Sequence, residues 1–351
     1  MQTDINFGGA TSGRKNDFAK VVEFVVEAEK LGIDCAWSAE AWGQDAIAPL
    51  AFVAARTERL LLGTGIVQIS ARAPVMTAMT AMTMAAISGG RFILGLGVSG
   101  PQVVEGLQGI PFAEPLTRLR ETVEIIRIAI AGEKVRYEGR FHQLPRPGGK
   151  GKALRLAQPA NPDIPIALAT LGPRSLELTG EIGDGWVGSC FSPETADAYW
   201  EPIRRGAAKA GRSLDGFLFR AGGVIGISDD VEGLIERCRP GLAFTLAAMG
   251  SPKTNFYNEA YRRIGFEDAA VRVQRLWLDG RRDDAVAAVP DEMVLATNLL
   301  GTEAMVRERI RTYRDAGVTM LSLVPMGRGM TEKLDALGRA VELVAQETAS
   351  T

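Results

Sequence analysis

The amino-acid sequence predicts an α/β protein built as a (β/α)8 barrel, the TIM barrel. Two observations lead to this fold class. Segments of strand length alternate with helical segments eight times along the chain, and nearly all the strand segments are continuous apolar runs. Such runs indicate strands buried on both faces, as in a parallel sheet covered by helices. We expect the 351 residues to form a single barrel domain, since barrels of this size occur.

The strands are recognised by their apolar runs and the helices by an apolar face with a period of 3.6 residues. In the first helix Val21, Val22 and Val25 lie on one side, Glu23 lies on the other, and Gly32 ends the helix. The expected strands are 5–8, 34–38, 60–69, 91–96, 164–170, 186–190, 217–227 and 320–324. The expected helices are 16–31, 45–57, 74–87, 116–131, 173–182, 194–211, 302–316 and 331–346.

Two insertions interrupt this alternation. Residues 134–158 contain a strand and turn followed by a basic, proline- and glycine-rich surface loop. Residues 229–300 are longer than one connection between strands requires, and their pattern is mostly helical. Because the second insertion precedes the last strand, we expect it to form a lid or a wall over the barrel mouth.

Composition and charge exclude several classes of function. The net charge of −2 argues against nucleic acid and against an anionic membrane surface as partners. Cys35, Cys190 and Cys238 are far apart, and His142 is the single histidine, so we expect no metal site and no disulfide framework. No signal peptide or membrane-spanning run is recognised, which predicts a cytoplasmic location.

A (β/α)8 barrel places its active site at the carboxyl ends of the strands. After the second strand, Glu40 and Trp42 are expected at this mouth, Glu40 as an acid or base and Trp42 as a wall facing substrate. The alternative for Glu40 is a solvated loop residue or a helix cap. Glu105, in the loop after the fourth strand, is a second candidate to meet substrate, or else a surface charge.

Glycines mark the next two strand ends. Gly63 and Gly65 in the third strand indicate a bulge or a close approach of the backbone to a ligand, with tight barrel packing as the alternative. The run from Gly95 to Gly100 has the spacing GxGxxG, but a dinucleotide-binding motif must open a helix, and we expect none before about Leu116. We interpret it as a ligand-facing loop.

The stretch 164–186 is a strand, a turn at Leu171-Gly172, and a helix with Pro173 in its first turn. A helix N-terminus directly after a strand, with Arg174 beside the free amides, is a reasonable phosphate site. An ordinary connection between a strand and a helix is the alternative. The methionines at 76, 79, 82 and 84 have helical spacing, which indicates core packing or a subunit contact.

Several of these motifs together resemble the luciferase-like flavin and deazaflavin oxidoreductases, in the branch related to methylenetetrahydromethanopterin reductase. They are the segments 40–43, 63–68, 90–101 and 172–182. The resemblance implies an enzyme with a bacterial-luciferase-like TIM barrel that binds coenzyme F420, and a homodimer. It implies a non-proline cis peptide bond at Gly65-Ile66. It also implies cofactor contacts from Gly65, Ile66, Gly97, Val98, Ser99, Thr170, Gly172, Pro173, Arg174 and Ser175.

The resemblance departs from its pattern in one place. Several relatives carry an Asp-His pair after the second strand, where this chain has Glu40-Ala41, so Glu40 becomes the substitute candidate for proton transfer. The favoured function is hydride transfer between the deazaflavin C5 and a small-molecule substrate. The alternatives are an FMN-dependent monooxygenase and a flavin- or deazaflavin-binding barrel without catalysis.

Overall fold

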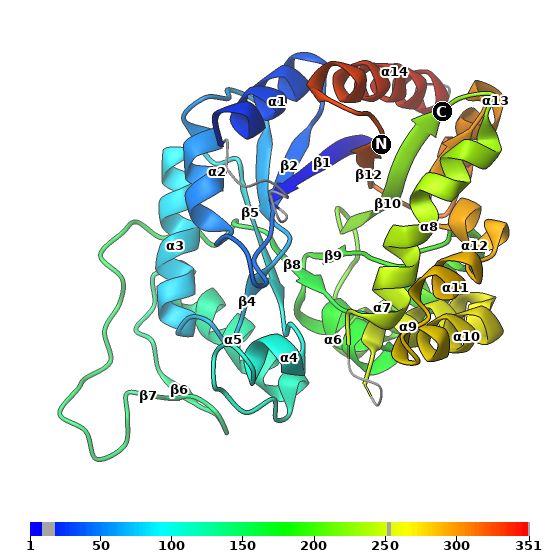
Figure 1. Cartoon of the computed structure of the whole chain (residues 1–351). Coiled ribbons are helices and arrows are strands. Elements are labelled where there is room, and N and C mark those ends of the chain that lie inside the picture. The colour runs from blue at the N-terminus through cyan, green and yellow to red at the C-terminus, as the bar shows by residue number, and fades with distance from the viewer. Residues whose placement is uncertain (9–17, 251–253, 350–351) are drawn as a thin grey trace.

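The predicted barrel is confirmed by the computed structural model, which describes residues 1–8, 18–250 and 254–349. Within these residues eight parallel strands close into a ring, surrounded by helices (Figure 1). In ring order the strands are β1 (Gln2–Gly8), β2 (Cys35–Ser38), β3 (Leu61–Thr64), β5 (Phe92–Gly97), β8 (Ile166–Ala169), β9 (Gly185–Val187), β10 (Leu218–Ile227) and β12 (Met320–Pro325).

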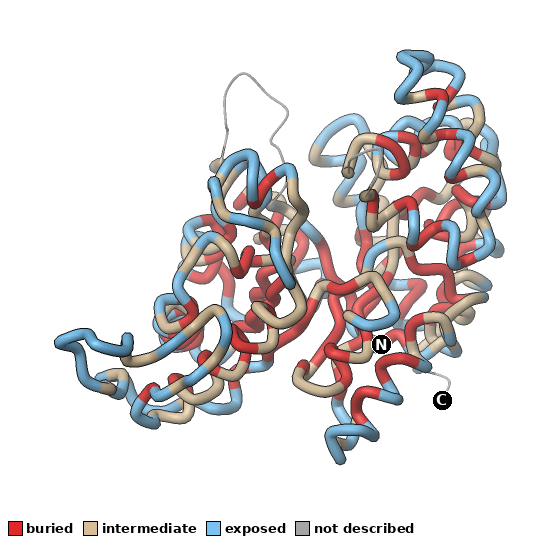
Figure 2. Tube along the Cα trace, turned by 90° about the horizontal axis from the view of Figure 1, so that it is seen from below, coloured by how far each residue is buried: buried red, intermediate tan, exposed pale blue. Residues whose placement is uncertain are grey.

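Helices cover the outside of the barrel and bury their apolar faces against the strands. Figure 2 shows the buried residues concentrated between the two layers. The helices on the outer wall include α1 (Phe18–Lys30), α2 (Ile47–Ala54), α3 (Pro74–Ile87), α5 (Pro115–Ile130), α6 (Pro173–Ile182), α7 (Asp197–Lys209), α13 (Glu303–Asp315) and α14 (Met330–Thr348). A short 3-10 turn at Pro193–Thr195 precedes α7. No helix of the described residues is long and apolar enough to cross a membrane.

The third expected strand is interrupted. A short strand β4 (Val67–Gln68) follows β3 and pairs with β5, and the two residues between them are joined by a cis peptide bond, Gly65-Ile66. The cis bond implied by the family resemblance is therefore present at the expected position. The glycine at 63 has a packing reason, since a Cβ there would lie 2.3 Å from Cε3 of Trp37.

One expectation about the connections is wrong, and one strand was not expected. A short helix, α4 (Pro101–Val104), begins directly after the glycine-rich loop, where the sequence predicted no helix before about Leu116. Gly100 has an extended backbone and Pro101 occupies the first helical position, which suits a helix start. The insertion at 229–300 also ends in a strand, β11 (Leu299–Gly301), which pairs in parallel with the end of β10.

The insertion at 229–300 is otherwise helical, as predicted. It contains α8 (Val231–Ala247), α9 (Phe256–Tyr261), a π-helical turn (Arg262–Phe266), α10 (Glu267–Leu278), α11 (Arg282–Ala287) and α12 (Asp291–Ala296). In the other insertion, 134–158, strands β6 (Tyr137–Glu138) and β7 (Gln143–Leu144) form an antiparallel pair. The segment that carries them projects from the body of the molecule (Figure 1).

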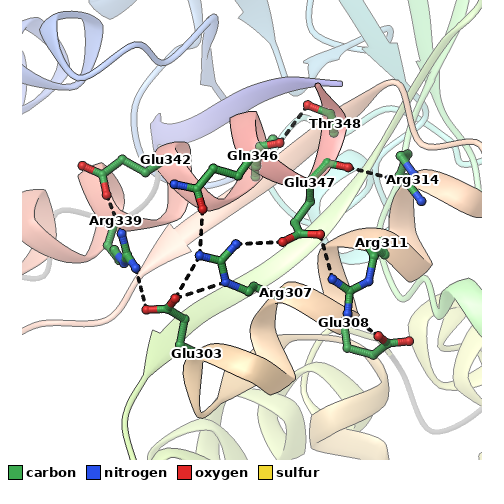
Figure 3. A network of polar contacts seen from close by, with 11 residues as sticks. Glu303, Arg307, Glu308, Arg311, Arg314, Arg339, Glu342, Gln346, Glu347 and Thr348 are labelled. Carbon is green, nitrogen blue, oxygen red and sulfur yellow. Dashed lines mark hydrogen bonds and ion pairs between the residues drawn. The ribbon is translucent and has the colours of Figure 1, made fainter. Parts of the chain in front are cut away.

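Ion pairs join α13 to the C-terminal helix α14. Arg307 bonds Glu303 on its own helix and Glu347 on α14, and Arg311 bonds Glu308 and the same Glu347 (Figure 3). Glu347 thus accepts from two arginines one helical turn apart. This network holds the last helix in place over the barrel.

A buried ion pair crosses the barrel interior. Arg220 on β10 donates to both carboxylate oxygens of Asp4 on β1, at 2.9 and 2.6 Å, and to the hydroxyl of Ser322 on β12 at 2.8 Å. Its guanidinium also lies 5.0 Å from the ring centroid of Trp37. Burial raises the pKa of Asp4, and the charge and hydrogen bonds of Arg220 oppose that rise. Three strands are therefore joined by one hydrogen-bonded group.

Removing one partner of this pair is expected to be costly. Arg220→Met should lower the free energy of unfolding by about 3–5 kcal/mol, because it leaves the buried Asp4 carboxylate without its partner. The double variant Asp4→Leu/Arg220→Met should recover most of that loss. Urea unfolding followed by circular dichroism measures both, and an Arg220→Met variant within about 1 kcal/mol of the natural chain contradicts this role.

Candidate active site

The barrel mouth brings together the predicted residues from the third, fourth and fifth expected strands. A Cβ built on Gly97 would lie 3.0 Å from Cγ1 of Ile66 and 3.6 Å from the Cβ of Ala169. Ile66, Gly97 and Ala169 therefore form one continuous wall at the carboxyl ends of β3, β5 and β8, which we call the Ile66 wall. A larger side chain at position 97 would occupy the space beside Ile66. The glycine therefore leaves that space open.

The loop after β5 continues from this wall. Ser99 has a positive φ of 58°, a conformation that non-glycine residues adopt infrequently. The loop then enters α4 and returns through residues 105–112. Glu105 accepts a hydrogen bond from the backbone amide of Phe112 at 2.9 Å, and this bond joins the two ends of the segment 105–112. Glu105 is exposed, so its carboxylate is accessible but is also engaged in holding its own loop.

Glu40 lies at the mouth after β2, with its side chain 8% exposed. Its Oε1 accepts from the backbone amide of Gln68 at 3.0 Å and from Arg72 Nη1 at 2.6 Å. Its Oε2 accepts from the backbone amide of Ala46 at 3.3 Å. Both oxygens are therefore occupied by donors of the protein itself. The prediction that Glu40 transfers a proton stays a prediction, and its geometry supports a different role that is developed below.

Three residues of this region were not expected from the sequence. Gln68 donates from its side-chain amide to the carbonyls of Glu40 and Ala41, each at 3.1 Å, and accepts from Gln108 at 2.7 Å. Arg72 supplies the charge that faces Glu40. The partners lie 27 to 40 residues apart in the chain, so no local pattern identified them. They tie the loops after β2, β4 and β5 together.

Trp42 follows Glu40 on the outer side of the mouth. It is 59% exposed, and among the large apolar residues that the structure describes only Leu107 and Leu154 are more exposed, at 65% and 64%. A tryptophan held this far into solvent is uncommon, since large aromatic side chains are highly buried on average. The contact of Trp42 with substrate stays a prediction.

The turn between β8 and α6 has the geometry expected of an anion site. Gly172 is the extended residue before the helix, Pro173 occupies its first position, and the hydroxyl of Ser175 donates to the Gly172 carbonyl at 2.8 Å. Arg174 is exposed and has no hydrogen-bond or ion-pair partner within residues 1–8, 18–250 and 254–349. Free first-turn amides beside an unpaired cation favour an anion.

Thr170 joins this turn to helix α6 and strand β9. Its hydroxyl lies 2.7 Å from that of Thr179 on α6, and its carbonyl accepts from the indole nitrogen of Trp186 at 2.8 Å. Thr170 is buried, so its side chain orients the helix and does not face the mouth directly.

A second cation reaches the same turn from the insertion. Arg263, in the π-helical turn, donates to the carbonyl of Leu171 at 2.7 Å, although the two residues are 92 positions apart. Arg262, beside it, pairs instead with Glu267. The structure thus selects Arg263 as the insertion residue at the turn.

The insertion is packed against the barrel as a wall. Tyr261 is buried and hydrogen-bonds the thiol of Cys190, and the hydroxyl of Tyr199 donates to the Cys190 carbonyl at 2.6 Å. Burial raises the pKa of the Cys190 thiol to about 12, against the opposing effects of Tyr261 and Arg263. A neutral, buried thiol is a poor nucleophile. Within the described residues no cluster of His, Cys, Asp or Glu has the makeup of a metal site.

The fold and this mouth define a TIM-barrel oxidoreductase of the luciferase-like type. The chain belongs to the luciferase-like monooxygenase family, whose model matches residues 3–320. The resemblance inferred from the sequence is therefore confirmed.

Two curated relatives and one solved structure are similar over nearly the whole chain. A Mycobacterium tuberculosis protein, provisionally named a coenzyme F420-dependent oxidoreductase, is 42% identical over 85% of this chain and 88% of its own. The 5,10-methylenetetrahydromethanopterin reductase of Archaeoglobus fulgidus is 31% identical over 91% and 93%. The structure of the coenzyme F420-dependent tetrahydromethanopterin reductase from Methanopyrus kandleri superposes with a TM-score of 0.78, at 27% identity, covering 99% of this chain and 98% of that one.

Proposed function

We propose that this chain is a coenzyme F420-dependent oxidoreductase that transfers a hydride between the deazaflavin and a small organic substrate. The observation that carries the proposal is the meeting of the Ile66 wall with the turn between β8 and α6 at one barrel mouth. The first offers an apolar surface with room beside Ile66 at Gly97, and the second offers free helix amides beside an arginine for an anion. The relatives named for F420 support this cofactor over FMN.

The residues present fit a flavin-like cofactor at both of its ends. Gly97 leaves room beside Ile66 that a Cβ would fill, which suits the close approach of a planar ring. Gly65, Val98 and Ser99 border the same surface. At the other end the amides of Arg174 and Ser175 and the two guanidinium groups of Arg174 and Arg263 would hold a phosphate.

When bound, the deazaflavin supplies a two-electron hydride acceptor or donor at C5. The protein contributes position and exclusion of water. The Ile66 wall orients the ring, and the packed insertion with Tyr261 forms a side of the site that excludes solvent. Trp42 and Glu105 lie on the loops that would face the substrate over the ring. Arg174 and Arg263 would pair with the cofactor phosphate and so would hold the cofactor in place at this end of the site.

An exposed apolar face supports the further proposal that the enzyme is a homodimer. Phe52 on α2 is 47% exposed, and Met76, Met79 and Ile87 on the neighbouring α3 are 52%, 43% and 53% exposed. The two helices lie side by side on the outer wall (Figure 1). Met82 and Met84 of the same helix are buried and have the core-packing role that the methionine spacing predicted, which leaves Met76 and Met79 for a subunit contact. Clustered exposed apolar side chains mark association surfaces.

Sedimentation equilibrium tests the homodimer. The natural chain should have the mass of two copies, and Met76→Glu/Met79→Glu should shift it toward one copy because it places charge in the apolar face. Val271→Glu/Leu278→Glu on α10, where two apolar side chains are similarly exposed outside this face, is the comparison variant. A natural chain with the mass of a single copy at micromolar concentration contradicts the proposal.

The anion site is tested with two forms of the cofactor. Arg174→Ala/Ser175→Ala and, separately, Arg263→Gln should each weaken F420 binding by about tenfold or more, the effect of losing a charge-assisted hydrogen bond. Neither should change the affinity for the deazaflavin with its ribityl chain but without phosphate. Fluorescence titration gives both dissociation constants.

Arg262→Gln is the matched control, since its guanidinium lies one residue away and pairs with Glu267. It should leave both affinities unchanged. Undiminished F420 affinity in both test variants would make the stretch at 171–175 an ordinary connection. Oxygen consumption with reduced FMN, if observed, would favour the monooxygenase alternative instead.

A further inference from the structure

We propose that Glu40 is a positioning residue, which together with Arg72, Gln68 and Gln108 holds the Ile66 wall in the geometry that the cofactor requires. The inference rests on the proposed function for its cofactor. It is an alternative to the proton-transfer role that the sequence predicted for Glu40.

The first support is the way the Glu40 carboxylate is used. A group that exchanges a proton with substrate needs an oxygen directed at the substrate. Oε1 of Glu40 already receives two donors, the Gln68 amide and the Arg72 guanidinium, and Oε2 faces the Ala46 amide. A charge-assisted bond of 2.6 Å to Arg72 is short and strong. These donors hold the carboxylate within the protein.

The second support is what the Glu40 segment is bonded to. The Glu40 amide donates to the carbonyl of Ile66 at 3.2 Å, and the Gly65 amide donates to the carbonyl of Ser38 at 2.7 Å. Both residues of the cis peptide are therefore hydrogen-bonded to the segment that ends β2. Gln68 closes the contact from the other side through its two bonds to the carbonyls of Glu40 and Ala41. The end of β2 thus fixes the backbone of the Ile66 wall.

The third support is the extension of the network to the loop after β5. The Gln108 side-chain amide donates to Gln68 Oε1 at 2.7 Å, which fastens the returning loop to the same glutamine. The Oε1 of Gln108 is itself buried without a partner in the described part of the chain. Gln68 therefore joins the loop after β5 to the segment that carries Glu40. Arg72 therefore acts on the wall through Glu40 and Gln68.

This arrangement gives the two roles opposite consequences for cofactor binding. If Glu40 transfers a proton, its replacement slows the chemical step and leaves the cofactor bound as before. If Glu40 positions the wall, the affinity itself falls when the Arg72–Glu40 pair is lost. Glutamine keeps a side-chain oxygen that can accept from Gln68 and Arg72, so Glu40→Gln should be tolerated where Glu40→Ala is not.

The experiment is a fluorescence titration of F420 against the full-length chain and its variants. Glu40→Ala and Arg72→Met should each weaken binding about tenfold, and Glu40→Gln should stay within about threefold of the natural chain. The double variant Glu40→Ala/Arg72→Met should bind no more weakly than either single variant, because both remove the same contact. The induced circular dichroism of bound F420 should change in the two damaging variants and be retained in Glu40→Gln.

Glu29→Ala is the matched control for a purely structural effect. Like Glu40, Glu29 is a carboxylate that accepts hydrogen bonds from backbone amides. Its three donors are the amides of Glu58, Arg59 and Leu60, which precede β3 at the opposite end of the barrel. Its loss should lower the melting temperature and leave F420 affinity unchanged. Comparison at a temperature well below every melting transition separates the two effects.

The outcomes distinguish the two proposals. Glu40→Ala and Arg72→Met variants that bind F420 like the natural chain overturn the positioning role while the proposed function stands. A natural chain that binds FMN in preference overturns the F420 assignment, and the same variants titrated with FMN then decide the positioning role. A natural chain that binds neither cofactor overturns both.

Discussion

Trp37 lies against Gly63 in the barrel interior, and the shape of the mouth depends on this contact. The indole is fully buried, and any side chain on residue 63 would overlap its ring. The neighbouring strand is equally crowded, since a Cβ on Gly95 would lie 1.7 Å from the carbonyl oxygen of Thr64. With these positions closed to side chains, the backbone of β3 approaches β5 and turns through Gly65-Ile66 into β4. The wall above Trp37 is therefore made largely of backbone and of Ile66.

Electrostatic contacts then hold the parts around this wall. The Asp4–Arg220 pair joins strands across the interior, below the indole of Trp37. At the mouth, the Arg72–Glu40 pair fixes the loops, and Arg263 brings the insertion to the turn before α6. Water screens the attraction between buried or half-buried charges less than it screens the attraction between surface charges. The exposed Arg174 remains unpaired among the described residues, which leaves it available to an anion.

Local sequence patterns predicted most of the barrel. Continuous apolar runs located the strands, Pro173 located the start of α6, and the family motifs located the cis bond at Gly65-Ile66. The patterns missed β11, whose three residues are too few for a recognisable run, and α4, which is a single turn. They also gave Glu40 a role from its position alone. Its partner Arg72 is 32 residues away, and contacts of that separation are set by the packing of loops rather than by periodicity.

The central claim is that the Ile66 wall and the turn at 171–175 form one site for a deazaflavin cofactor. It is tested most directly by titrating the purified protein with F420 and FMN side by side under the same conditions. We predict saturable binding of F420 with an affinity at least tenfold above that of FMN, a difference of about 1.4 kcal/mol. Equal affinities, or a preference for FMN, would contradict the claim.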